Sequence, residues 1–203
     1  QIFKEAYRLN YQLENIFAAA ELEAGEIEFA PAKVNASAMV LEIVDEMENL
    51  VHGKNLTFDI QAEDDSFILT DGPKLNLALM NILANAAEFS PKYGRIQVNL
   101  NADEWGFLIS VQDNGPGIPQ ESQDKIFDRF RQLDEGSTKA YLGQGLGLSM
   151  TKAMVELLGG EIEVTSLPGQ GCTVRIVLPS SVAIEHDENS DEGTYLSGNV
   201  QLF

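Results

Sequence analysis

Apolar residues in the first 24 positions recur at alternating spacings of four and three. The set comprises Ile2, Ala6, Leu9, Leu13, Ile16 and Ala20. This a/d spacing is typical of a helix in a coiled coil or helical bundle, and Gly25 is a residue type that commonly ends a helix. The alternative is one amphipathic helix lying on the chain's own core, but such a helix usually carries a wider apolar stripe. The pattern therefore favours a helix that joins a bundle.

The rest of the chain alternates between helical and strand periods. Helical spacing predicts helices over 37–52, 73–88 and 146–158, and alternation predicts strands over 56–61, 66–70, 95–101, 107–112, 161–166 and 172–178. We expect Asn35 or Ser37 to cap the first of these helices. The two strands within 95–112 are expected to form a hairpin with its turn at Trp105 and Gly106, and the polar stretch 114–144 is long enough for a functional lid. Helices on one face of a mixed sheet make this an α+β fold, a two-layer α/β sandwich.

Composition limits the classes of function. With 44% apolar residues among 203 and no apolar run near the roughly 18 needed to span a bilayer, we expect a globular chain without direct membrane contact. Cys172 is the only cysteine, which excludes an internal disulfide and favours a cytoplasmic location. A formal net charge of −19 argues against nucleic acid as a partner. An anionic ligand would therefore need local help from a metal ion, backbone N–H groups and a few placed cations.

Three glycine-rich segments follow an asparagine-bearing helix in one order: DNGPGIP at 113–119, GQGLGL at 143–148 and GQGCT at 169–173. A carboxylate at Asp113, directly after a strand, can accept a hydrogen bond from the amine of adenine, although an ordinary Asp-Asn-Gly turn is the simpler interpretation. GQGLGL opens a helix, where unpaired N–H groups and the positive dipole end attract phosphate. Each segment alone is weak, but together they predict a nucleotide pocket.

This ordered set resembles the ATP-binding domain of sensor histidine kinases, within the larger group that includes gyrase, Hsp90 and mismatch-repair ATPases. The resemblance covers about 58–179 and implies the Bergerat-type ATP-binding fold, preceded by one bundle-forming helix. It implies ATP and Mg²⁺ as ligands, with Asn85 as the metal contact and with Asn81 and Lys139 in catalytic roles. The nucleotide-binding positions it implies are Asn85, Phe89, Asp113, Gly115, Gly117, Ile118, Phe127, Arg131, Lys139, Gly143, Gly145, Leu146, Gly147, Leu148 and Thr173.

Asn81 and Asn85 lie one helical turn apart and share a face. Without the glycine segments, the pair would more simply cap or cross-link the core; with them, an amide oxygen is a reasonable Mg²⁺ ligand. The hydrolytic relatives carry a Glu at the position of Asn81, and an amide cannot serve as that general base. The resemblance therefore implies phosphoryl transfer rather than hydrolysis. Glu88 replaces the family's usual basic residue and adds repulsion toward phosphate unless a cation compensates, while Cys172 is expected to be a small buried residue.

The histidines limit what this chain does unaided. The family's acceptor histidine lies on the first helix of a dimerisation hairpin, and neither His52 nor His186 matches its motif. We therefore expect a fragment of a longer kinase. Its predicted parts are the end of the second hairpin helix at 1–25, a linker at 26–36, the catalytic domain at 37–179 and an acidic tail at 180–203.

The implied reaction moves the γ-phosphoryl group of Mg-ATP to a histidine outside this chain. The resemblance further implies a homodimer joined through the N-terminal helix and a response-regulator receiver domain as the next acceptor. One alternative is a degenerate kinase-like binding or regulatory module with weak or no ATP binding, which Glu88 supports. Another is an ATPase of the gyrase or Hsp90 kind, which Asn81 disfavours.

Overall fold

The computed structural model describes residues 2–51, 53–62, 66–102, 106–123, 125–128 and 145–179, with the backbone alone at 2–8 and 48–51. The elements in chain order are α1 Ile2–Ala24, β1 Ala32–Asn35, α2 Ala36–Val51, β2 Thr57–Ala62, β3 Phe67–Thr70, α3 Gly72–Phe89, β4 Arg95–Ala102, β5 Gly106–Gln112, α4 Gln120–Gln123, α5 Gly147–Leu157, β6 Glu161–Ser166 and β7 Cys172–Pro179. Every helix and strand predicted from the sequence is present, with ends that agree to within about one residue.

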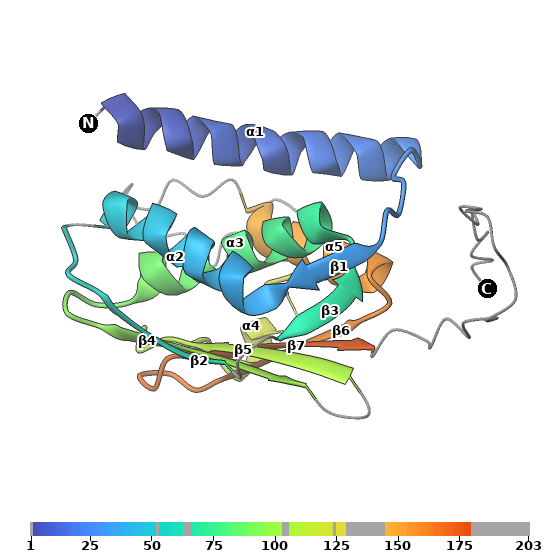
Figure 1. Cartoon of the computed structure of the whole chain (residues 1–203). Helices are drawn as coiled ribbons and strands as arrows, with labels where there is room; N and C mark the ends of the chain where they lie inside the picture. The colour runs from blue at the N-terminus through green and yellow to red at the C-terminus, as the bar shows by residue number, and fades with distance from the viewer. Residues whose placement is uncertain are drawn as a thin grey trace, which may run out of the picture.

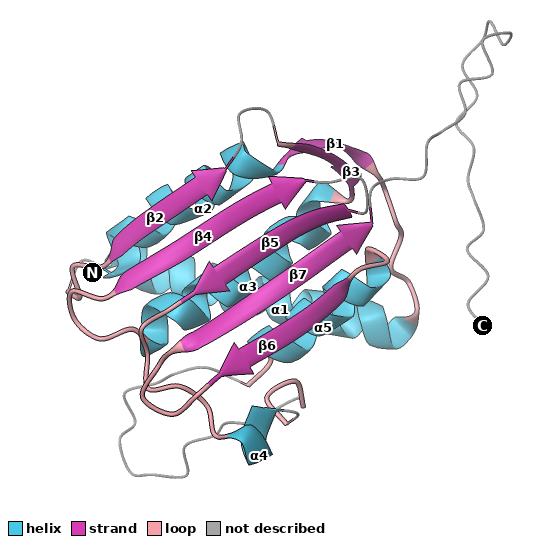
Figure 2. Cartoon of the chain, turned by 90° about the horizontal axis from the view of Figure 1, so that it is seen from below, coloured by secondary structure: helices cyan, strands magenta, loops and turns pink. Residues whose placement is uncertain are grey.

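Five strands form the main sheet in the order β2-β4-β5-β7-β6. β2 pairs with β4 in parallel, and the other neighbours are antiparallel, so the sheet is mixed as predicted. Along β4, Ile96, Val98 and Leu100 are fully buried while the residues between them are not, which is the alternation of a strand with one face on a core. Figure 2 shows the sheet face-on with α1, α2, α3 and α5 on its far side. The α+β sandwich is confirmed.

α3 runs through the middle of the helix layer and carries both asparagines of interest. The carboxylate of Asp71 accepts a hydrogen bond from the backbone N–H of Lys74 (3.2 Å) and so caps the start of the helix. Leu75, Leu79 and Leu83 recur every four residues along one side, and all three are fully buried. This buried stripe fixes the rotation of α3 about its axis, and thereby decides which way its polar residues face.

The segment predicted to be a linker contains a strand that the sequence did not predict. β1 pairs antiparallel with β3 as a separate two-stranded sheet, with Val34 opposite Ile68. Val34 is the one large aliphatic residue of β1, so four residues carry too little alternation to be recognised. At its end, Oδ1 of Asn35 accepts a hydrogen bond from the backbone N–H of Ala38 (2.9 Å), which identifies Asn35 rather than Ser37 as the cap of α2.

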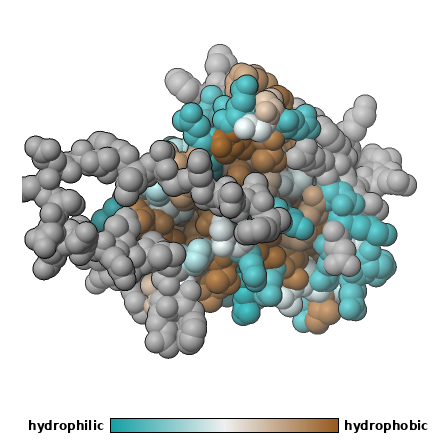
Figure 3. Space-filling model, turned by 90° about the vertical axis from the view of Figure 1, so that its right-hand side faces the viewer, coloured by the Kyte–Doolittle hydropathy of each residue, from teal (hydrophilic) through white to brown (hydrophobic). Residues whose placement is uncertain are grey.

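α1 lies across the helix layer as a further layer (Figure 1). Its a/d seam faces away from the domain, because Leu9, Leu13 and Ile16 are 55%, 48% and 42% exposed while Asn15 is 4% exposed. Figure 3 shows hydrophobic surface at the top of the molecule, over α1. The helix therefore rests on the domain with one face and leaves its seam exposed on the other. No helix within the described ranges is both long and apolar enough to cross a bilayer.

Candidate functional site

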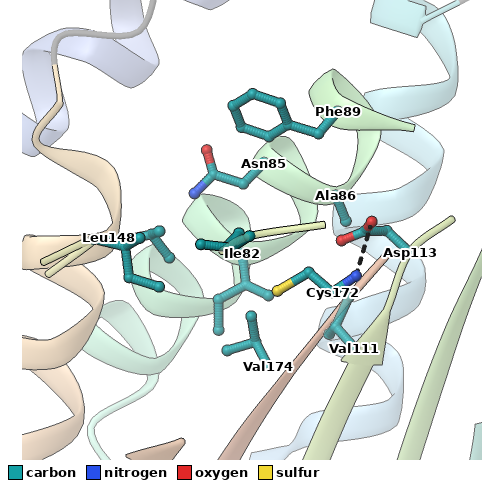
Figure 4. A pocket seen from close by; sticks show the side chains of 11 residues that line it. Ile82, Asn85, Ala86, Phe89, Val111, Asp113, Leu148, Cys172 and Val174 are labelled. Carbon is teal, nitrogen blue, oxygen red and sulfur yellow. Dashed lines mark hydrogen bonds between the residues drawn. The ribbon is translucent and has the colours of Figure 1, made fainter. Parts of the chain in front are cut away.

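A pocket lies between α3, the ends of β5 and β7, and the start of α5 (Figure 4). It is lined by Ile82, Asn85, Ala86, Phe89, Val111, Asp113, Ile118, Ile126, Leu148, Cys172 and Val174. Most of these side chains are apolar, and Asn85 and Asp113 supply polar groups. Such a lining is typical of a site for a flat, largely apolar ring with a few polar edges. Asn85, Phe89, Asp113, Ile118 and Leu148 are positions that the sequence predicts for nucleotide binding.

Asp113 follows β5 and is almost fully buried. Its Oδ1 accepts hydrogen bonds from the backbone N–H groups of Gly115 (2.7 Å) and Cys172 (3.2 Å). Burial raises the pKa of this carboxyl above its usual range, and the two N–H donors oppose the rise. Figure 4 shows the other carboxylate oxygen on the pocket side. A buried acceptor in this position suits a ligand that carries an amine donor.

The first and third glycine segments meet beside Asp113. A Cβ atom on Gly115 would lie 2.8 Å from Oδ1 of Asp113 and 3.1 Å from the carbonyl oxygen of Phe89, so a side chain there would displace one of them. The backbone N–H of Ile118 donates to Oγ of Ser166 (2.8 Å), which ends β6 just before the third segment. These contacts join the end of α3, the loop after β5 and the β6–β7 turn into one wall of the pocket.

The second glycine segment leads into α5. The helix begins at Gly147, directly after Leu146, and within the described part of the chain no side chain caps its first turn. The N–H groups at such an end carry partial positive charge and suit phosphate. A Cβ atom on Gly147 would lie 3.3 Å from Oδ1 of Asn81, so this helix end packs closely against α3. Leu148 lines the pocket, and Gly145 precedes the helix in a left-handed conformation (φ +69°).

Asn81 is held by the N-terminal helix. The Tyr11 hydroxyl donates to Oδ1 of Asn81, Nδ2 of Asn81 donates to Oδ1 of Asn15 (2.9 Å), and Nδ2 of Asn15 donates to the carbonyl oxygen of Tyr11 (3.0 Å). Burial raises the pKa of the Tyr11 phenol, so it remains protonated and able to donate. Asn81 is fully buried and is not among the residues that line the pocket. Its predicted catalytic role therefore stays a prediction, whereas its contact with α1 is an observation.

Other predicted positions lie around the pocket or outside the described residues. Phe127 directly follows the lining residue Ile126, and Nζ of Lys152 lies 5.7 Å from the centroid of its ring. Thr173 pairs with Gln112 and Thr165 within the sheet. Gly117 (φ +72°) packs against the backbone of Leu167. Arg131, Lys139, Gly143, His52, His186 and the predicted acidic tail all lie outside the described residues.

Some lining residues were not predicted, although spacing carried a signal for several. Ile82 and Ala86 lie three residues before Asn85 and Phe89, on the same face of α3, and Val111 lies two residues before Asp113 on β5. Cys172 is partly rather than fully buried, and it lines the pocket. Burial raises the pKa of its thiol to about 12, so the thiol stays protonated at neutral pH.

The donor set of the pocket fits a metal ion that arrives with its ligand. Within the described ranges, no group of three or more His, Cys, Asp or Glu side chains could hold a metal by itself. Mg²⁺ does not require such a group, because it commonly takes one or two protein oxygens together with phosphates and water. The amide oxygen of Asn85, which lines the pocket, is a suitable hard ligand for it.

A mixed sheet with helices on one face and an apolar pocket that holds a buried carboxylate are typical of an α+β nucleotide-binding domain. Residues 70–182 match the family model described as "Histidine kinase-, DNA gyrase B-, and HSP90-like ATPase". The match covers more than half of the chain, and the chain therefore belongs to this family.

Within this broad family, the similar proteins are sensor histidine kinases. Sensor histidine kinase TmoS of Ectopseudomonas mendocina is 31% identical over 200 residues, which cover 98% of this chain and 20% of TmoS. Sensor histidine kinase WalK of Bacillus subtilis is 38% identical over 125 residues, or 61% of this chain and 20% of WalK. The chain thus spans about a fifth of the length of these curated relatives.

Solved structures agree with this family. The catalytic domain of histidine kinase ThkA has a TM-score of 0.65 and 25% identity, covering 76% of this chain and 97% of that one. Full-length ShkA in complex with AMPPNP has a TM-score of 0.72 and 26% identity, covering 85% of this chain and 36% of that one. The chain therefore contains an ATPase-type domain of the kind found in sensor histidine kinases.

Proposed function

We propose that this chain is the catalytic, ATP-binding part of a two-component sensor histidine kinase that acts in the cytoplasm. The buried carboxylate of Asp113 carries the proposal, because it offers an acceptor for the adenine amine at one side of an apolar pocket. Leu148, at the start of α5, lines the opposite side (Figure 4). The pocket thus has a polar end for adenine and, across from it, a helix start that suits phosphate.

In this proposal the chain's own groups bind and orient the nucleotide. Asp113 and the apolar walls select the adenine ring, Asn85 supplies an oxygen for Mg²⁺, and the N–H groups of α5 face the phosphates. The metal ion, when bound, neutralises phosphate charge. Phosphoryl transfer depends mainly on such positioning and electrostatic stabilisation. The γ-phosphoryl group would pass to a histidine on another segment and then to a response-regulator receiver domain, since the amide of Asn81 cannot activate water for hydrolysis.

The 203-residue chain should bind a non-hydrolysable ATP analogue with Mg²⁺ and yet show no self-labelling with γ-labelled ATP. The reason is that neither His52 nor His186 carries the acceptor motif. Adding an acceptor hairpin, and then a receiver domain, should produce labelling of each in turn. Label at His52 or His186, found by peptide mapping, would contradict the assignment of this chain as the catalytic part alone.

Asn85→Ala should weaken binding of the Mg-loaded analogue at least tenfold, or about 1.4 kcal/mol, by removing the amide oxygen from the pocket. Adenosine has no phosphates to share a metal, so its binding should change little. Asn76→Ala is the matched control, because Asn76 lies on the same helix but is exposed and outside the pocket. Equal loss of both ligands in Asn85→Ala would exclude a role through the metal ion.

We also propose that the exposed seam of α1 joins two copies of the chain. Leu13→Glu places a charge on that seam and should convert a dimer into a monomer, as measured by light scattering. Leu41→Glu is the control, because Leu41 is 56% exposed on α2 and does not belong to the seam. A dimer that survives Leu13→Glu would argue against this face, and so would a chain that is monomeric from the start.

A degenerate binding module is the second candidate function. Glu88 favours it, because a half-buried carboxylate lies in the same helical turn as the pocket residues Asn85 and Phe89. Such a carboxylate repels an anionic ligand. Calorimetric titration separates the two candidates, since absence of binding at millimolar nucleotide would favour the module.

A further inference from the structure

Lys54 reaches from the loop between α2 and β2 to the C-terminal end of α3. Its ammonium donates hydrogen bonds to the backbone carbonyl oxygens of Ala87 (3.1 Å), Ser90 (3.0 Å) and Glu88. The last carbonyl groups of a helix have no partner within the helix, and they carry the negative end of its dipole. α3 has no basic residue in its own last turn. A cation from a distant part of the chain therefore supplies the cap.

The turn that Lys54 caps forms part of the pocket wall. Phe89 lines the pocket, and its carbonyl oxygen is the atom that a side chain on Gly115 would approach to 3.1 Å. The carbonyl groups of Glu88 and Ser90, on either side of Phe89, both accept from Lys54. Lys54 thus holds the backbone on both sides of Phe89, next to the segment that carries Asp113.

The ammonium of Lys54 also offsets a charge that the site would otherwise carry. Glu88 follows Asn85 by three residues, so the two share a face of α3. Burial raises the pKa of Glu88, and the charge of Lys54 opposes that rise; in the same way, burial lowers the pKa of Lys54, and Glu88 opposes that fall. Each group thus favours the charged form of the other. Because the ammonium is bonded to the backbone carbonyl of Glu88 itself, its positive charge lies near the carboxylate of the same residue.

We propose that Lys54 is a positioning residue of the nucleotide site, which clamps the last turn of α3 and neutralises Glu88 so that the site accepts a polyphosphate. This inference rests on the proposed function and adds the element that lets the pocket tolerate Glu88. The lysine comes from a loop more than thirty residues before α3 ends, so the compensation for Glu88 is not visible along the helix itself. It also explains how an acidic residue can replace a basic one at that position without loss of the site.

The test removes these charges, singly and together, and compares the binding of two ligands. Lys54→Met keeps the length of the side chain and removes its charge, and Lys54→Met with Glu88→Gln removes both charges. Lys33→Met is the matched control, since Lys33 is exposed on β1 and its ammonium lies over the ring of Phe67. Binding of the Mg-loaded ATP analogue and of adenosine, which is uncharged, is measured by NMR titration, and thermal unfolding is recorded for each variant.

Lys54→Met should weaken binding of the ATP analogue about tenfold and binding of adenosine clearly less, because an uncompensated carboxylate repels phosphate. The double variant should recover most of the lost affinity, and Lys33→Met should bind as the wild type does. Equal weakening of both ligands, or no recovery in the double variant, would reduce Lys54 to a purely structural cap and overturn the inference. A wild-type chain that binds neither ligand would instead refute the proposed function itself, and the inference with it.

Discussion

Asp113→Asn should weaken adenine-nucleotide binding by about 30- to 150-fold, or roughly 2–3 kcal/mol, without lowering the stability of the fold. The amide oxygen of asparagine can still accept the hydrogen bonds that the backbone N–H groups of Gly115 and Cys172 donate to Oδ1 of Asp113. The other position becomes an NH₂ group, which places a donor against the donor of adenine. Ligand binding is therefore lost while the internal contacts remain.

The stability of the variant follows from the pKa of Asp113. Burial holds this pKa above its usual range, so the folded chain binds the proton more tightly than the unfolded chain does. The carboxyl group therefore makes the folded state less stable as pH rises through the folded-state pKa toward neutrality. Asp113→Asn removes this term, and its free energy of unfolding at neutral pH should equal or exceed that of the wild type. The gain should fade as the pH is lowered through that range.

Calorimetric titration and denaturant unfolding at two pH values test both parts of this expectation. Asp59→Asn is the control, because Asp59 lies on β2, pairs with the exposed side chain of Arg95 and is not among the residues that line the pocket. A surface ion pair of this kind contributes at most about 1 kcal/mol to the stability of the fold. Because neither residue lines the pocket, nucleotide affinity should not change. Unchanged affinity in Asp113→Asn would show that the carboxylate does not contact the nucleotide. The proposed function would then lose the observation on which it mainly rests.

The elements of the domain could be predicted because each carries its own period. Ile96, Val98 and Leu100 alternate with polar neighbours, and the strand they predict is β4. Leu75, Leu79 and Leu83 recur at helical spacing, and the helix they predict is α3. The pattern of apolar residues cannot identify an element that is too short to show a repeat. β1 is such an element, and its partner β3 lies more than thirty residues later in the chain.

The site was predictable only where a motif placed its residues close together in sequence. Asp113 and Gly115 belong to one segment, and their hydrogen bond joins residues two positions apart. The bond between Asp113 and Cys172 spans 59 residues, and the one between Tyr11 and Asn81 spans 70. No pattern along the sequence predicts these two hydrogen bonds, because they depend on how distant strands and helices pack against one another. For this reason the sequence indicates a catalytic or core-linking role for Asn81, but it does not predict that Tyr11 of α1 bonds to it.

Gly171→Ala should lower the free energy of unfolding by roughly 3 kcal/mol and weaken nucleotide binding at least tenfold in the molecules that still fold. Gly171 has a φ of +78°, and a Cβ atom there would lie 2.0 Å from the carbonyl oxygen of Asp113. The backbone at Asp113 would have to move, and its carboxylate would move with it. The damage should therefore appear in both stability and binding.

Gly169→Ala is the control for Gly171→Ala, because it separates the cost of backbone strain from the cost of the clash with Asp113. Gly169 has nearly the same φ, +79°, and a Cβ atom there would meet no atom within 4 Å. Both variants force alanine into the left-handed region, which costs about 1 kcal/mol. Gly169→Ala should show only that loss and should bind nucleotide normally, as judged by denaturant unfolding and calorimetric titration. If the two variants behave alike, the approach of the third glycine segment to Asp113 is not what shapes this pocket, and the glycines serve the turn alone.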